Sequence, residues 1–137
     1  MWENKLEIKC LKAVCEEARL KGKLTEKHMA SLTRIFGSRF SNAWRAVNER
    51  RVKKYFFKPS GRIVWIVVGR RRDYLVMPAA NFCSCDDFYY NVMNEKAYLC
   101  YHLIAQKLAE SLGLFDTIKE DDSFYDVFMK EWRKVTS

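Results

Sequence analysis

Four residues with metal-binding side chains form two close pairs, Cys83-x-Cys85 and Cys100-x-His102, separated by fourteen residues. This spacing supplies the four sulfur and nitrogen ligands that Zn²⁺ takes in a tetrahedral structural site. Because side chains fill all four positions, no place is left for a reacting water, and we expect one structural Zn²⁺. Such a site constrains the fold strongly, since it joins a strand or hairpin near residue 83 to the start of a helix near residue 100.

Other interpretations of the same residues stay open. Cys83 and Cys85 are alternatively two buried thiols or a redox pair, and His102 is alternatively an exposed helix residue. The coincidence of two pairs at metal-ligand spacing favours zinc. Cys10 and Cys15 lie five apart in a helical stretch without a histidine between them, so we expect core or half-buried thiols there.

The compartment follows from the cysteine count and the first residues. Five cysteines are an odd number, and the charges of Glu3 and Lys5 interrupt what would be the apolar stretch of a signal peptide. We therefore expect an intracellular protein, cytoplasmic in a prokaryote and nuclear in a eukaryote. The longest apolar run, Ile63 to Val68, is too short for a membrane span, so we expect no membrane partner.

Hydrophobic periodicity predicts an α+β fold in one domain, residues 1–137, which is a usual length for a single domain. Apolar residues at helical spacing predict three N-terminal helices within residues 1–51. Thr25 is the expected N-cap of the second helix, which stops at Gly37. Ser38 or Ser41 opens the third.

The middle of the chain changes to β-branched and aromatic residues. Runs at 52–57, 62–69 and 74–77 predict a three-stranded antiparallel β-meander joined by turns. The meander leads into a zinc-pinned hairpin and then a helix that ends at Gly113. We take residues 52–112 as this meander, zinc site and helix.

Residues 113–137 are expected to form a C-terminal helical extension. Residues 122–135 have helical spacing, with Ser123 as a candidate cap. An aromatic stripe at positions i, i+3 and i+7 belongs to this helix. It forms either part of the core or a docking face for a partner, through Tyr125, Phe128 and Trp132.

Positive charge is concentrated in one stretch. The chain has 25 Lys and Arg against 17 Asp and Glu, a net +8, yet Arg45 to Arg72 alone carries ten bases and one acid, so the rest sums to −1. This pattern is typical of a polyanion-binding face, although a solvated basic face is the simpler alternative. The turn at 70–72 is the strongest candidate. The candidate DNA-binding residues are Lys53, Lys54, Lys58, Arg62, Arg70, Arg71 and Arg72.

The ligand pattern resembles that of the SWIM zinc-binding domain. The segments SLTRIFGS (31–38), PSGRIVWIVVG (59–69), CSC (83–85) and CYHL (100–103) occur in the order of the small SWIM-only proteins of the Shu-complex type. The resemblance covers roughly residues 25–112. Two departures are Tyr101, where the family often has a basic residue, and the basic turn at 70–72.

This resemblance implies a non-enzymatic accessory factor in homologous recombination and DNA repair. It implies zinc ligation by the four residues above and pairing with a RecA/Rad51-type paralogue ATPase. It also implies binding to DNA, as single strands or recombination intermediates. A homodimer is left open.

Two other classes of function were weighed. A stand-alone transcription regulator would read duplex DNA through the third helix, where Arg39, Asn42 and Arg45 are available. An enzyme is disfavoured, because the sequence lacks a Gly-rich phosphate loop and the H-x-E and P-C-x-x-C motifs of zinc deaminases.

Overall fold

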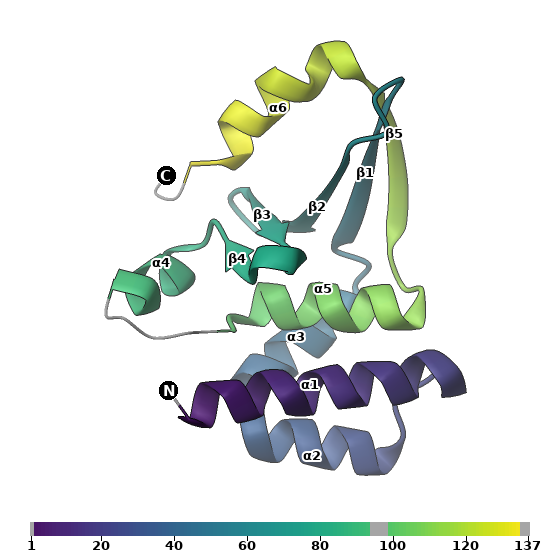
Figure 1. Cartoon of the computed structure of the whole chain (residues 1–137), viewed down its shortest axis with the longest axis vertical. Helices are drawn as coiled ribbons and strands as arrows, with labels where there is room; N and C mark the ends of the chain where they lie inside the picture. The colour runs from purple at the N-terminus through teal and green to yellow at the C-terminus, as the bar shows by residue number, and fades with distance from the viewer. Residues whose placement is uncertain (1, 94–98, 135–137) are drawn as a thin grey trace.

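The structure is a computed structural model that describes residues 2–93 and 99–134 (Figure 1). Three helices come first: α1 (Trp2–Lys21), α2 (Glu26–Phe36) and α3 (Ser38–Asn48). Four strands follow: β1 (Val52–Lys58), β2 (Ile63–Val68), β3 (Asp73–Met77) and β4 (Phe82–Cys83). The rest comprises α4 (Asp86–Met93), α5 (Tyr101–Leu112), β5 (Asp116–Asp121) and α6 (Tyr125–Trp132). Short 3-10 turns, η1 (Pro78–Ala80) and η2 (Asp122–Phe124), precede β4 and α6. The α+β class is confirmed.

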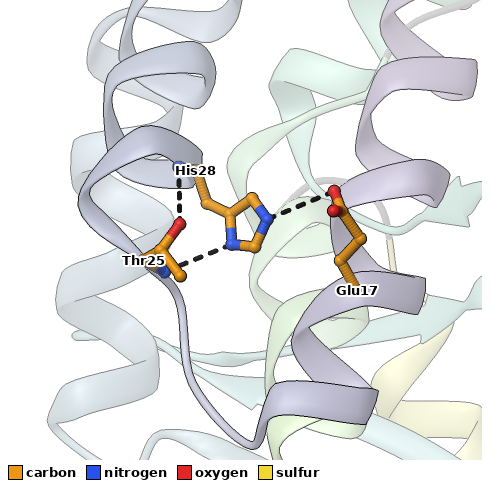
Figure 2. A network of polar contacts seen from close by, with 3 residues as sticks. All are labelled: Glu17, Thr25 and His28. Carbon is orange, nitrogen blue, oxygen red and sulfur yellow. Dashed lines mark hydrogen bonds and ion pairs between the residues drawn. The ribbon is translucent and has the colours of Figure 1, made fainter.

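The start of α2 explains why the first two helices pack as a hairpin. The Thr25 hydroxyl accepts a hydrogen bond from the His28 N–H, and His28 Nδ1 accepts one from the Thr25 N–H, both at 3.2 Å. Because Nδ1 accepts, Nε2 carries the proton, and it lies 3.3 Å from the Glu17 carboxylate of α1 (Figure 2). This capping box confirms Thr25 as N-cap and ties the two helices together.

The sheet has five strands in the order β4-β3-β2-β1-β5. The predicted antiparallel meander is present, since β1 pairs with β2 and β2 with β3. β4 extends it as an antiparallel hairpin partner of β3. The sheet has more strands than the predicted three-stranded meander, because β4 pairs with β3 and β5 forms a parallel edge next to β1.

The C-terminal part, residues 113–137, is therefore only partly the helical extension that was predicted. β5 has the sequence DTIKED, with Ile118 as its one large apolar residue, so periodicity gives no strand signal. Its strand conformation comes from pairing with β1 and from the Asp116 carboxylate, which accepts a 2.7 Å bond from Lys53 Nζ. The cap before α6 is also different: Asp121, not Ser123, caps η2 by accepting the Ser123 N–H. The predicted helix end at residue 135 lies outside the described residues.

The sheet separates two hydrophobic cores. Alternate residues of β2 point to opposite sides, with Trp65 and Val67 in one core and Val64 and Ile66 in the other. The larger core lies between the sheet and the layer formed by α1, α2, α3 and α5 (Figure 1). The smaller core is covered by α6, which crosses the sheet far from that layer. In the part of the chain that the structure describes, no helix has the length and apolar character to cross a membrane.

Candidate metal centre

The four predicted ligands come together where the β3–β4 hairpin meets α5. Cys83 ends β4, and Cys85 directly precedes α4. Cys100 is the N-cap residue of α5, and His102 lies in its first turn. One ligand atom from each lies within 4.8 Å of all the others, and all four residues are buried. Within residues 2–93 and 99–134, this is the one group of three or more His, Cys, Asp and Glu side chains placed to hold a metal ion.

The geometry fits Zn²⁺. A tetrahedral zinc with ordinary bond lengths separates a sulfur from a nitrogen ligand by about 3.6 Å. Cys100 Sγ lies 3.9 Å from His102 Nδ1. The other ring nitrogen, Nε2, is buried and has no hydrogen-bond partner among the described residues. The site thus offers three thiols and one imidazole nitrogen, a set of donors that suits one structural zinc. These four ligands leave no coordination position for a substrate.

The thiols have strongly divergent acidities. The pKa of Cys85 lies far below its ordinary value, chiefly because Cys100 and Cys83 donate hydrogen bonds to its sulfur. The Phe88 N–H, at the start of α4, also donates to this sulfur at 3.3 Å. Burial raises the pKa of Cys100 to about 12. The Cys85 thiol is thus the most acidic of the three, which favours binding of a cation, and a bound divalent metal would deprotonate all three thiols.

Arg72 compensates the charge of this centre. Three thiolates and a neutral imidazole around Zn²⁺ carry a net charge of −1. The Arg72 guanidinium donates to Ser84 O at 2.9 Å and Ser84 Oγ at 3.1 Å, directly between Cys83 and Cys85. Ser84 Oγ in turn accepts the Leu75 N–H, so the CSC segment is fixed to β3. Arg72 therefore orients the ligands from outside the metal's coordination sphere.

Two tyrosines hold the imidazole of His102. The ring centroids of Tyr74 and Tyr101 lie 4.2 Å and 3.9 Å from that of His102. Arg72 lies over the Tyr74 ring as well, 5.0 Å from its centroid. From the sequence, Tyr101 was expected only as a departure from the family pattern. Tyr74, Ser84 and the ligand-orienting role of Arg72 were not predicted. The sequence gives no sign that Arg72 contacts the segment of Cys83 and Cys85, because the hairpin that brings them together forms only in the fold.

The seven predicted DNA-binding residues lie in three places. Lys53 and Lys54 lie on β1, where Lys53 pairs with Asp116 and Lys54 lies over the rings of Trp65 and Phe115. At the β1–β2 hairpin, Arg62 stacks on Tyr125 and Lys58 lies over Phe56. At the β2–β3 turn, Arg72 turns inward as described. The two remaining arginines are exposed there, Arg70 and Arg71.

The aromatic rings of the basic stretch are mostly covered, so they are not available to stack on bases. Phe57 is fully buried and Trp65 is 7% exposed. The partner-docking stripe also packs inward: Tyr125 lies edge-on to Phe57, and Phe128 and Trp132 contact Tyr55. Within the chain, these side chains therefore make the contacts expected of core residues. Their docking role stays a prediction.

The third helix, α3, has fewer exposed side chains that could contact duplex DNA than expected. Arg39 donates to the Glu7 carboxylate at 2.8 Å and to Leu99 O at 2.9 Å, so it is held within the helical layer. Asn42 and Arg45 remain exposed on α3. Two side chains are a small set for reading bases in a groove.

Comparison with known proteins gives one informative match. The chain is 30% identical over 104 residues to the "Zinc finger SWIM domain-containing protein 7 homolog" of Dictyostelium discoideum, covering 74% of this chain and 67% of that protein. No family model matches, and no solved structure matches. The match and the buried Cys₃His cluster agree with the resemblance drawn from the sequence. The chain belongs to the family of SWIM zinc-finger proteins that includes this Dictyostelium homologue.

Proposed function

We propose that this protein is a non-enzymatic accessory factor in homologous recombination and DNA repair. In this role it binds DNA through its basic surface and docks a RecA/Rad51-type paralogue ATPase. The zinc-binding domain itself is established by the ligand cluster and the family. The recombination role rests on the resemblance to the Shu-complex type of SWIM protein.

The observation that carries the DNA-binding part is the arrangement of positive charge around a closed metal centre. The zinc ligands are buried and leave no open coordination position, which supports a structural rather than a catalytic metal. Arg70 and Arg71 are exposed immediately beside it, on the turn that also carries the ligand-orienting Arg72. The metal thereby fixes a rigid base for a basic turn, which is a suitable device for holding phosphates.

The proposed partner surface is α6. Its aromatic stripe (Tyr125, Phe128 and Trp132) contacts β1, and Tyr125 and Phe128 remain half-exposed. Two apolar residues beside the stripe extend outward, Phe124 at 48% and Val127 at 66% exposure. A partner docking here would cover apolar side chains that water now contacts.

The test is a pull-down of the tagged chain from native cells, with zinc in the buffers and nuclease to remove bridging DNA. Recovery of a RecA-fold ATPase is the expected result, and Val127→Glu should abolish it. The matched control is Lys130→Glu, which introduces the same side chain at an exposed position of α6. Recovery of the chain alone, with the ATPase absent from wild type, would contradict the docking proposal.

A further inference from the structure

A cavity of about 740 Å³ lies beside the zinc centre, between α3, the β2–β3 turn and the start of α5. Its lining includes Asn42 and Arg45 from α3, Arg70 and Arg71 from the turn, Tyr74 from β3 and Tyr101 from α5. Two separate predictions of the sequence analysis, the third helix and the basic turn, thus meet on opposite sides of one space. Its volume is within the range of pockets that enclose small ligands, about 300–1,000 Å³, so it admits a nucleotide rather than a duplex.

The charge of the cavity is strongly positive. No hydrogen bond or ion pair holds the side chains of Arg45, Arg70 or Arg71 within residues 2–93 and 99–134. The acid on the wall, Glu49, is already paired with Arg51 at 3.1 Å. Three guanidinium groups therefore line the cavity without a partner among the described residues, and such groups pair well with the oxygens of a phosphodiester.

A second hollow on the other side of the turn is less suited to a polyanion. Its volume is about 600 Å³, and it shares Arg70 and Arg71 with the first. Arg72, Lys134, Asp73 and Glu131 also line it, and Lys134 is paired with Glu131 at 3.1 Å. The Asp73 carboxylate opposes a phosphate there, whereas the acid of the first cavity, Glu49, is paired, so the charge favours the side of α3.

The cavity has an aromatic wall that the zinc centre positions. Tyr101 is half-buried and lies against His102, with Tyr74 on the same imidazole. The turn is packed tightly on this wall: a Cβ on Gly69 would lie 2.6 Å from the Tyr74 ring and 2.7 Å from Arg72 O. Hence the backbone of the turn is held in a fixed relation to the tyrosines, and the metal ligands lie behind that wall.

We propose that this cavity binds single-stranded DNA, with Arg45, Arg70 and Arg71 contacting its phosphates and Tyr101 against a base or sugar. The inference rests on the proposed DNA-binding function and assigns its site. Guanidinium groups beside an aromatic ring are the elements that bind single strands, because unpaired bases offer a face for stacking. The basic residues of β1, Lys53, Lys54 and Lys58, are not part of this site.

The test uses the full chain loaded with zinc and a fluorescent oligothymidylate of about 16 nucleotides, the upper site size of a single-strand-binding module. The double variant Arg45→Glu/Arg71→Glu removes one contact from each side of the cavity. We expect at least about a tenfold loss of affinity at low salt and a salt slope smaller by about 1.4, because each single-strand phosphate contact contributes about 0.7. The matched control, Lys23→Glu/Arg34→Glu, makes the same change of charge at exposed positions of the helical layer.

A second variant tests the aromatic wall separately. Tyr101→Leu should weaken binding by about fivefold or more without changing the salt slope, whereas Tyr101→Phe should bind as wild type. Zinc content, measured on each variant, shows whether the metal centre is intact.

Each outcome distinguishes the site from the function. A loss confined to the Arg45/Arg71 variant and Tyr101→Leu supports the cavity. Equal losses in the cavity variant and the control, or none in either, would overturn the site while DNA binding itself stands. A wild type that prefers duplex at the same salt would overturn the single-strand assignment, and a wild type that binds no DNA would overturn the proposed function as well.

Discussion

The two sides of the sheet are stabilised in different ways. On one side, a core of helices and strand residues surrounds a metal centre whose ligands all come from residues 83–102. On the other side, six buried residues and a few aromatic neighbours lie under α6 alone. The metal ligands come from segments close in sequence, whereas the core under α6 needs β1 and α6, which are far apart in the chain. This difference teaches that zinc stabilises only part of the molecule, and it predicts which changes release the metal and which do not.

The largest effect is expected from removing a ligand. Cys100→Ser should lose zinc and lower the free energy of unfolding by several kcal/mol, with hydrogen exchange rising first in β4 and α5. Structural zinc supplies about 10–16 kcal/mol in zinc-finger peptides, and the helical layer here retains a core of its own, so the loss should be smaller. Metal analysis by mass spectrometry and thermal unfolding measure both quantities. Cys10→Ser, a cysteine outside the cluster, is the control. A variant with native stability and no zinc would contradict the prediction.

The next largest effect separates the two sides. Trp132 is 7% exposed and packs on Tyr55 with ring centroids 4.8 Å apart. Trp132→Ala should cost about 3 kcal/mol, the low end for a large aromatic, because α6 is peripheral and the site can partly collapse. Zinc content should be unchanged. The control is Val127→Ala, on the exposed side of α6, which should leave stability near wild type. Loss of zinc in Trp132→Ala would contradict the independence of the two sides of the sheet.

A smaller effect is expected at the metal centre. Arg72→Ala removes the bonds to Ser84 and the positive charge beside three thiolates. Zinc affinity should fall about 10- to 100-fold, as for other residues that orient metal ligands. Competition with a chromophoric chelator measures it. Arg71→Ala lies next in sequence and is exposed, so its zinc affinity should equal that of wild type.

The smallest effect concerns the edge at β5. The Lys53 ammonium donates a hydrogen bond to Asp116 and holds the pKa of that carboxyl below its usual range. Since the folded pKa lies below the unfolded value of about 3.9, the pair stabilises the fold above that pH, and the stabilisation is lost as pH falls through the lowered pKa. Asp116→Asn should therefore lower Tm slightly at neutral pH, less so in high salt, and reduce the dependence of Tm on acid. Asp126→Asn on α6 is the control; an equal change there would show a general charge effect.

The metal side was largely predictable from the sequence. Ligand identity and spacing fix Cys83, Cys85, Cys100 and His102, and local signals such as the Thr25 cap define the helices. Capping and hydrophobic periodicity act over a few residues, so they can be recognised from the sequence alone.

The rest of the fold was less predictable, because its determinants act over long range. β5 has no strand pattern of its own, and only pairing with β1 makes it a strand. The short helix α4 was also missed. Arg72 was interpreted as a DNA contact from charge alone, since the sequence does not show that the β2–β3 turn brings it to Ser84. Charge density predicts a basic surface, but only packing shows which arginines are already engaged.

The parallel pairing of β1 with β5 has a consequence for synthesis on the ribosome. β1 completes its antiparallel pairing with β2 as soon as residue 68 emerges, but its other edge stays open until residues 116–121 follow. During that interval the strand presents unpaired backbone groups and the aromatic run Tyr55 to Phe57, the kind of edge that joins to other chains. A chain interrupted at Gly113 would retain every zinc ligand and still expose this edge, so it would bind metal and aggregate.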